Sequence, residues 1–386
     1  MKYLSTIPPM LEDEELIEAL EKYPTFTDIH TSKSNRLIHA QDVFNVYVPN
    51  KMSVEVYNLV YFLLLQSCHR KEENKTFRSS NNDSALLCGV AGIGKSETVL
   101  RIADVLFPKR IVEMEEPYLL IVPILVVEVS TIASFKSFLL SVLCSLDRII
   151  GTNYGNVKTS VTTDELLSAT SKALNLHVLL LVIEEFNFIN DGSRAYNFSN
   201  QIVALINIVN VSILFVATPK ALSFFASTDY LARRSLGKAY KELDYEEFEH
   251  LTLELSKYNY TIKGAAVDHE TIRYLYKVCN GNPALLKQVL AEAQVYAITT
   301  GYEKLDKHSL SKAAENKLAT MRPHLENDSV VKHQREVKQK AVLSLVLNSD
   351  KELVNIFANT ARKADKDSKN MINHIKQFIS VEEIDI

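Results

Sequence analysis

Hydrophobic and polar positions divide the middle of the chain into alternating strands and helices. Unbroken apolar runs predict strands at 84–88, 119–129, 178–183 and 212–217. Apolar residues at helical spacing predict helices at 95–106, 134–149, 164–174 and 199–209. Because the strand runs lack polar alternation, both faces of the sheet must be covered. The pattern therefore predicts an α/β fold with a parallel sheet between layers of helices.

The segments on either side have different patterns. Residues 11–22 read as a short acidic helix, 26–50 as irregular polar chain, and 53–69 as an amphipathic helix that enters the sheet region. After Tyr245 the pattern is helical throughout. We therefore divide the chain into an N-terminal accessory arm, a core, a helical lid and a C-terminal tail, at 1–50, 51–245, 246–320 and 321–386.

Composition narrows the classes of function. The chain has 386 residues, a net charge of -4 and a pI of about 6.2, so any contact with nucleic acid must come from a local patch. Its four cysteines lack the paired spacing of a zinc site or a disulfide framework, which favours a reducing cytoplasm. The N-terminus is acidic and no apolar run is long enough to span a bilayer, so we expect a soluble protein without a membrane partner.

One stretch carries a phosphate-binding pattern, "LLCGVAGIGKSETVL" at 86–100. Its glycines allow backbone N–H groups to surround phosphates, Lys95 supplies a positive charge, and the Ser96 hydroxyl is placed to ligate Mg²⁺. The pattern also lies between a predicted strand and a helix start, which argues against a chance match. It predicts ATP and Mg²⁺ as cofactors, with the nucleotide held by Gly89, Val90, Ala91, Gly92, Ile93, Gly94, Lys95, Ser96 and Glu97.

Two acids follow a later strand, in "HVLLLVIEEFNFI". Glu184 is the candidate Mg²⁺ ligand together with Ser96, and Glu185 is the candidate base that orients the attacking water. The simpler alternative is a pair of solvated acids at a strand end. A glutamate at position 184, where an aspartate is usual, puts the rate of hydrolysis in doubt.

The next strand ends in "LFVATPKAL" and is followed by "LARRSLGKAY". Thr218 is a candidate sensor of the γ-phosphate, although a strand-end threonine is often a turn residue. Arg233 and Arg234 are candidate arginine fingers, because planar cations stabilise the charge that develops during phosphoryl transfer. A solvated polar face is the alternative interpretation of the two arginines.

The sequence resembles the TnsC/TniB group of AAA+ transposition regulators, ATPases that link target selection to the transposase in heteromeric, including CRISPR-associated, transposons. The resemblance covers about Tyr47 to Thr320 and rests on "GVAGIGKSETV", "SFKSFLLSVLCSLDRIIGTNYG", "LLLVIEEFNFI" and, most specifically, "LFVATPKAL" followed by "ARRSLGKAY". The chain departs from the family pattern at Glu184, at Ala217, where glycine is expected, and at Lys287, where many AAA+ lids carry a sensor arginine.

This resemblance implies an AAA+ P-loop ATPase with a parallel five-stranded sheet flanked by helices, a small all-helical lid and a partner-binding C-terminal tail. It implies a homo-oligomer, either a ring or a helical filament, that binds duplex DNA without sequence preference in the bacterial cytoplasm. A TniQ- or TnsD-like targeting protein would contact one face of the oligomer, and transposase subunits another.

The resemblance also implies two further sets of contacts. Ser130, Thr131 and Lys136 follow a predicted strand near a helix start, where hydroxyls, backbone amides and an ammonium would face one run of DNA phosphates. Lys287, in "GNPALLKQ", would contact the nucleotide phosphates. For both Lys136 and Lys287 the simpler interpretation is an exposed lysine on a helix.

Three other classes of function remain open. A STAND-type signalling ATPase also carries a glycine-asparagine-proline turn in its lid, but it normally appends long sensor repeats, and only about sixty residues follow the lid here. A small-molecule P-loop kinase would need a substrate lid and an acceptor pocket. A nucleotide-dependent binding module with little hydrolysis is compatible with Glu184.

Overall fold

The structure is a computed structural model. It describes residues 3–73, 84–107, 111–115, 118–129, 134–158, 160–186, 193–222, 225 and 235–315. The chain divides into two units, Met1–Gln334 and Arg335–Ile386, and the second lies outside the described residues. In the described chain no helix is long and apolar enough to cross a membrane.

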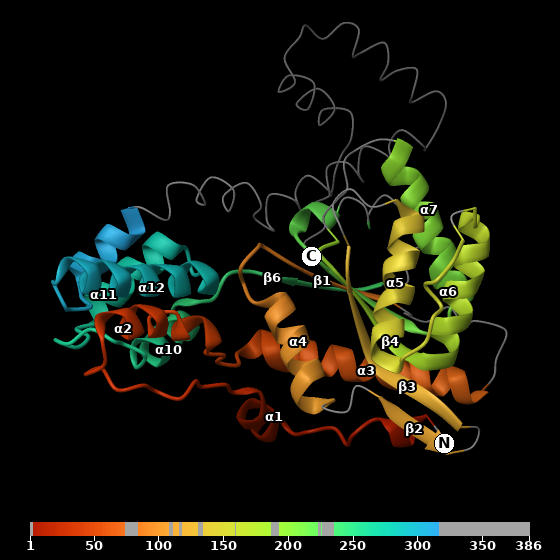
Figure 1. The fold of residues 1–386 in the computed structure, drawn as a ribbon, viewed down its shortest axis with the longest axis horizontal. Helices are drawn as coiled ribbons and strands as arrows, with labels where there is room; N and C mark the ends of the chain where they lie inside the picture. The colour runs from red at the N-terminus through yellow and green to blue at the C-terminus, as the bar shows by residue number, and fades with distance from the viewer. Residues whose placement is uncertain are drawn as a thin grey trace, which may run out of the picture. The chain divides into compact units, whose positions relative to one another are not determined.

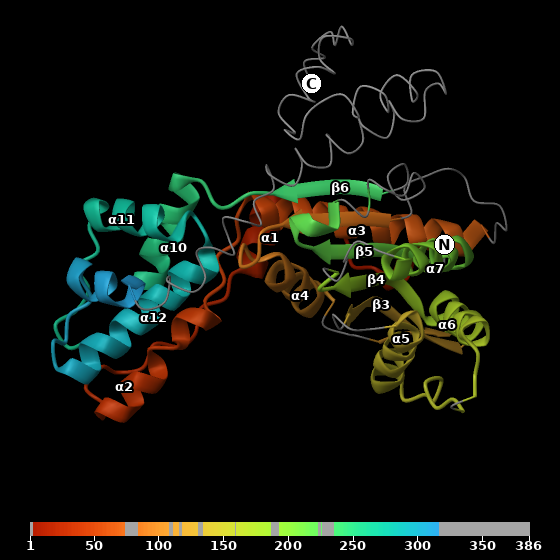
Figure 2. The ribbon, with the colours of Figure 1, turned by 90° about the horizontal axis from the view of Figure 1, so that it is seen from above.

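A six-stranded sheet forms the centre of the first unit (Figures 1 and 2). Its strand order is β2-β3-β4-β5-β1-β6. Five strands are parallel and β2 pairs antiparallel with β3 at one edge. The strands are β1 (Ser84–Gly89), β2 (Val112–Glu115), β3 (Tyr118–Glu128), β4 (Val178–Glu184), β5 (Ser212–Ala217) and β6 (Ser235–Tyr240).

The predicted α/β fold class is confirmed, but the expected five-stranded sheet is wrong by one strand. The additional strand β2 has only four residues. The other edge strand, β6, has the sequence SLGKAY, with Gly237 and Lys238 exposed. Neither edge strand carries the unbroken apolar run that identifies a buried strand, so the apolar pattern alone revealed only the four strands between them.

Helices cover both faces of the sheet, as Figure 1 shows. On one face α5 (Phe135–Ile150), α6 (Thr163–His177) and α7 (Ser193–Ile208) form a core with the strands. On the other face α1 (Asp13–Leu20), α3 (Lys51–Glu73) and α4 (Lys95–Leu106) form a second core. Successive β1 residues alternate between the two cores, Ala85 and Leu87 facing one and Leu86 and Cys88 the other, because strand side chains alternate in direction.

The C-terminal part of the described chain is helical, with α10 (Tyr245–Ser256), α11 (His269–Cys279) and α12 (Pro283–Thr300). Each helix begins at a side-chain cap: Asp244, Asp268 and Asn282 accept hydrogen bonds from N–H groups in the first turn. The three helices share their own hydrophobic core. Asn280 and Gly281 have φ values of 52° and 67°, so the chain turns sharply before α12.

The N-terminal segment is packed against the rest of this unit. The expectation of irregular chain over 26–50 is wrong, because α2 (Lys33–His39) and the 3₁₀ helix η2 (Asp42–Asn45) form there. Val43 joins the core of α10–α12, and Figure 1 shows α2 beside those helices. Arg36 forms an ion pair with Glu303 at 2.7 Å. The packing partners of this segment lie more than 200 residues away in sequence, so no local pattern announces them.

Candidate nucleotide site

The predicted phosphate loop connects β1 to α4, with glycines where the backbone requires them. Gly92 and Gly94 have φ values of 85° and 96°, in the left-handed region that glycine adopts without strain. Lys95 is 7% exposed, and its Nζ donates hydrogen bonds to the carbonyl oxygens of Gly89 at 2.7 Å and Val90 at 2.9 Å. Burial lowers the pKa of Lys95 to about 8, against the opposing influence of Cys88, Glu185 and Glu184. A negatively charged phosphate beside Lys95 would stabilise its protonated form.

Ser96 and Glu184 meet although 88 residues separate them. The Ser96 hydroxyl donates a 2.5 Å hydrogen bond to Glu184 Oε2. Strand β5 lies between β1 and β4, so the contact spans the carboxyl edge of three strands. Burial raises the pKa of Glu184, and the neighbouring carboxylates of Glu185 and Glu128 add to the effect.

The oxygen atoms of Ser96 and Glu184 suit the coordination of Mg²⁺. Glu184 Oε1 is buried and has no hydrogen-bond partner, which leaves a carboxylate oxygen available to a cation. In the part of the chain that the structure describes, no group of three or more His, Cys, Asp or Glu residues could hold a metal by itself. That result suits Mg²⁺, which usually binds one or two protein oxygens and takes its other ligands from water and nucleotide phosphates.

Glu185 and Thr218 lie at the same edge of the sheet. They line, together with the phosphate loop and Glu184, a cavity of about 310 Å³. Glu185 has φ 56°, a left-handed conformation that is uncommon for a residue other than glycine. Backbone strain of this kind concentrates at functional sites, because the surrounding structure must enforce it. Glu184 and Glu185 are neighbours in sequence, but the Glu184 side chain is buried and the Glu185 side chain is exposed to solvent.

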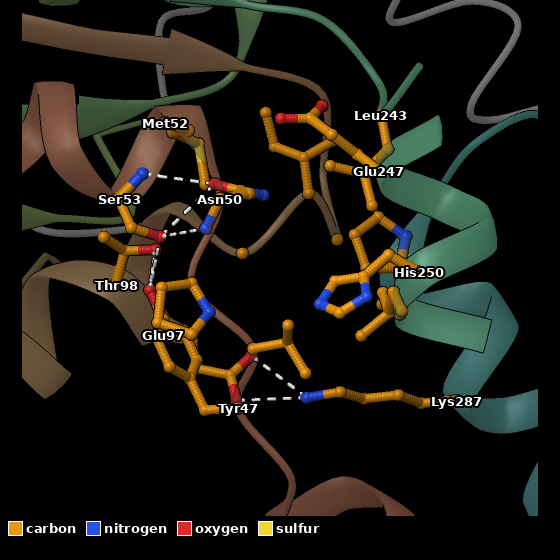
Figure 3. A pocket seen from close by; sticks show the side chains of 18 of the residues that line it. Tyr47, Asn50, Met52, Ser53, Glu97, Thr98, Leu243, Glu247, His250 and Lys287 are labelled. Carbon is orange, nitrogen blue, oxygen red and sulfur yellow. Dashed lines mark hydrogen bonds and ion pairs between the residues drawn. The ribbon is translucent and has the colours of Figure 1, made fainter. Parts of the chain in front are cut away.

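A second cavity of about 400 Å³ adjoins the phosphate loop (Figure 3). Its lining comes from the N-terminal segment, the start of α3, the phosphate loop, α4, α10 and α12. The Tyr47 hydroxyl lies 2.9 Å from both Ser53 Oγ and Thr98 Oγ1, and His250 points into the space from α10. The two cavities share Gly92, Gly94, Glu97 and Ala284 in their linings, so one ligand with phosphates and an apolar ring system can occupy both.

Sequence reasoning missed this second cavity. Tyr47 and Asn50 lie in "YVPN", at the end of the predicted arm, and neither they nor His250 belong to a recognisable ligand-binding motif. Their proximity to the phosphate loop depends on how the N-terminal segment and α10 pack. The proline and asparagine in "YVPN" were the one available signal of a shaped turn.

Lys287 lies near the site but does not point freely into it. Its Nζ forms an ion pair with Glu97 Oε1 at 3.1 Å, and Figure 3 shows the side chain reaching from α12 to α4. The Lys287 side chain is 9% exposed and that of Glu97 is 45% exposed. The interpretation of Lys287 as an ordinary exposed helix lysine is therefore wrong, since the residue joins the two parts that border the nucleotide cavity.

Other predicted site residues are not brought together here. Arg233, Arg234, Ser130 and Thr131 lie outside the described residues. Lys136, on α5, donates a 2.6 Å hydrogen bond to the carbonyl oxygen of Val161. Its proposed contact with DNA stays a prediction, and any phosphate would have to compete with this carbonyl.

The family comparison agrees with this geometry. Residues 71–240 match the model of the family described as "Bacterial TniB protein". This part of the chain is similar to TniB proteins. The match contains the phosphate loop, Glu184, Glu185 and Thr218, and it confirms the resemblance that the motifs indicated. The matched region ends with β6, so the match does not include α10–α12.

Comparisons with solved structures return replication proteins. The Aeropyrum pernix ORC1 protein in complex with DNA is 12% identical, with 88% of this chain and 80% of that chain covered and a TM-score of 0.49. Domain III of the Thermotoga maritima replication initiation protein DnaA is 15% identical, with 67% and 92% covered and a TM-score of 0.40. Drosophila ORC bound to DNA is 11% identical, with 98% and 85% covered and a TM-score of 0.46. No curated protein matches the sequence.

Proposed function

We propose that this protein is an ATP-dependent regulator of DNA transposition. It binds ATP with Mg²⁺, assembles with copies of itself on duplex DNA, and links a TniQ- or TnsD-like targeting protein to the transposase subunits. The observation that carries the proposal is the Ser96–Glu184 contact beside Lys95, within the region that is similar to TniB proteins. Two cavities that share the phosphate loop support ATP as the ligand.

The roles of the site residues follow from their positions. The loop amides of Gly89–Ser96 and the Lys95 ammonium bind the phosphates, and Ser96 and Glu184 hold the metal. A bound Mg²⁺ neutralises charge on the transferring phosphoryl group. Glu185 orients the attacking water, Thr218 contacts the γ-phosphate, and Arg233 and Arg234 act on the nucleotide of a neighbouring copy.

A nucleotide-dependent switch with little hydrolysis, as in STAND-type signalling ATPases, is the second candidate. It is favoured by Glu184, whose side chain is longer than that of aspartate and whose pKa is raised by burial. In that case nucleotide exchange rather than turnover would change the state of the protein.

The test is phosphate release from ATP and Mg²⁺, with and without duplex DNA, while the same samples are imaged for assemblies. We expect DNA-stimulated release and ATP-dependent assemblies on the duplex. Glu185→Gln should retain ATP binding and lose turnover by about a hundredfold, because positioning survives while proton acceptance does not. Glu113→Gln, an exposed glutamate on the edge strand β2, is the control and should hydrolyse normally.

The outcomes separate the candidates. ATP binding without measurable release in the wild-type protein would support the switch. Parental turnover in Glu185→Gln would remove Glu185 from its role. Wild-type protein that does not bind ATP would overturn the proposal.

A further inference from the structure

Asn282 lies where the phosphate loop meets the start of α12, and it is 1% exposed. Its side chain makes two hydrogen bonds with different purposes. Oδ1 accepts from the backbone N–H of Leu285 at 3.2 Å and so caps α12. Nδ2 donates to the carbonyl oxygen of Ala91 at 2.8 Å, across 191 residues of sequence.

A second contact lies directly beside the first. The backbone N–H of Ala284 donates to the carbonyl oxygen of Gly92 at 3.1 Å. The fit is close, because a Cβ on Gly92 would come within 2.8 Å of Asn282 Oδ1 and 2.9 Å of the Ala284 Cβ. The start of α12 therefore rests on the backbone of the phosphate loop itself.

These two bonds set the direction of the loop amides. In a planar trans peptide the C=O and N–H groups point to opposite sides. Since the Ala91 carbonyl is held by Asn282, the N–H of Gly92 in the same peptide must face away from α12. The Gly92 carbonyl, held by Ala284, orients the N–H of Ile93 in the same way.

We propose that Asn282 is a positioning residue that presets the phosphate loop for the nucleotide and ties loop geometry to the position of α12. This inference rests on the proposed nucleotide-binding function. Asn282 holds the peptide between Ala91 and Gly92 before any ligand arrives, which removes part of the ordering cost of binding. By linkage, a bound nucleotide stabilises the contact between the loop and α12 to the same extent.

Backbone hydrogen bonds of the turn before α12 hold Asn282 in place. Its backbone N–H donates to Cys279 at 3.0 Å, and the Gly281 carbonyl accepts from Leu243 at 3.0 Å. Lys287, one turn further along α12, adds its ion pair with Glu97. Three contacts thus join α12 to the phosphate loop and α4, and Asn282 makes the one that reaches a loop peptide through a side chain.

Asn282→Asp separates the two roles of the residue. Aspartate is an equally good helix cap, so the bond to Leu285 is retained. It has no N–H group to donate to Ala91, and its carboxylate faces the Ala91 carbonyl. We expect the affinity for both ATP and ADP to fall about tenfold, since one hydrogen bond and its preorganisation are lost and loop amides contact phosphates that both nucleotides carry. KM should rise with little change in kcat.

The matched control is Asp268→Ala, which removes the cap of the neighbouring helix α11 without touching the loop. It should lower thermal stability while leaving nucleotide affinity unchanged. Asn282→Ser, which keeps a capping oxygen but is too short to reach Ala91, should reproduce the affinity loss of Asn282→Asp if the aspartate variant folds poorly.

Hydrogen exchange in nucleotide-free protein gives an independent measurement. The amides of Gly92 and Ile93 should exchange faster in Asn282→Asp than in wild-type protein or Asp268→Ala. Unchanged loop exchange together with unchanged nucleotide affinity would overturn the positioning role. A different result would be that Asn282→Asp exchanges faster but the wild-type protein binds neither ATP nor ADP. That result would overturn the proposed function and leave the mechanical link between Asn282 and the loop standing.

Discussion

At the residue scale, the protonation of Lys95 is the property most open to measurement. Its ammonium is buried against two loop carbonyls, and burial lowers its pKa to about 8. Near neutral pH the side chain is mostly charged, and above its pKa it becomes neutral. Bound phosphates favour the charged form and so raise this pKa, which links ATP affinity to pH.

We predict that ATP binding takes up protons, and that the uptake grows between about pH 7 and pH 9 as free Lys95 loses its charge. ATP affinity should fall over the same range by up to about tenfold per pH unit. Calorimetry in buffers of different ionisation enthalpy measures the uptake directly. Lys95→Ala should abolish binding, and constant proton uptake across this range would exclude Lys95 as the titrating group.

At the element scale, the N-terminal segment joins two parts of the first unit. The Arg101 guanidinium on α4 donates to the carbonyl oxygens of Leu20 at 2.9 Å and Glu21 at 2.8 Å. Lys22 and Tyr47 form an isolated antiparallel bridge, and Tyr47 lines the cavity of about 400 Å³ beside the phosphate loop. Further along the chain, α2 packs against α12. The N-terminal segment therefore contacts α4 and α12, and through Tyr47 it also contributes a side chain to the cavity lining.

Arg36→Ala should lower the free energy of unfolding by about 2 kcal/mol, because it leaves the half-buried Glu303 carboxylate without its charged hydrogen-bond donor. Lys257→Ala, which breaks the more exposed pair with Glu254, should cost less than about 1 kcal/mol. Urea unfolding measures the loss of stability in both variants. Equal losses would show that the Arg36–Glu303 pair stabilises the protein no more than an exposed ion pair does.

The same pair predicts a dependence on pH. The hydrogen bond from Arg36 lowers the pKa of Glu303 below its usual value of 4.5. Its stabilising contribution is therefore complete above pH 4.5 and is lost as the pH falls through the lowered value. The difference between wild-type protein and Arg36→Ala should shrink on acidification.

Helix α5 carries the candidate DNA contact. Lys136→Ala should weaken binding to all duplex sequences alike and reduce the salt dependence by about one counter-ion per subunit. Because Lys136 also holds the Val161 carbonyl, thermal stability must be measured on the same variant. Lys172→Ala, on the exposed surface of α6, is the control. A parental salt slope in Lys136→Ala would move the DNA contact to another surface.

At the scale of the whole molecule, the proposed site is completed by a second copy of the chain. The phosphate loop, Glu184 and Glu185 would contact the nucleotide of their own copy, and the proposed arginine fingers would contact the nucleotide of a neighbouring copy. Replacing Arg233 and Arg234 by alanine should weaken ATP-dependent self-association more than ATP binding by the isolated subunit. Sedimentation with and without ATP, set beside nucleotide titration, measures both. Equal losses would indicate a folding defect, and no loss would return the two arginines to a solvated face.

The sequence by itself determined the features that depend on neighbours along the chain. The phosphate loop, the helix Lys95–Leu106 and the strand Ser212–Ala217 were all predicted, because each is a local pattern of backbone or side-chain chemistry. Glu184 was predicted to lie near Ser96, since the carboxyl ends of parallel strands meet at one edge.

Only the tertiary structure decided the features that join distant segments. The edge strand β6 pairs with β1 despite an exposed, polar sequence, and α2 folds because α12 covers it. The second cavity, and the bond from Asn282 to Ala91, likewise depend on where α10 and α12 settle against the phosphate loop. The physical reason is that a hydrogen bond or packing contact between residues 191 positions apart leaves no periodic trace in either segment, so it is specified by how the two segments fit together.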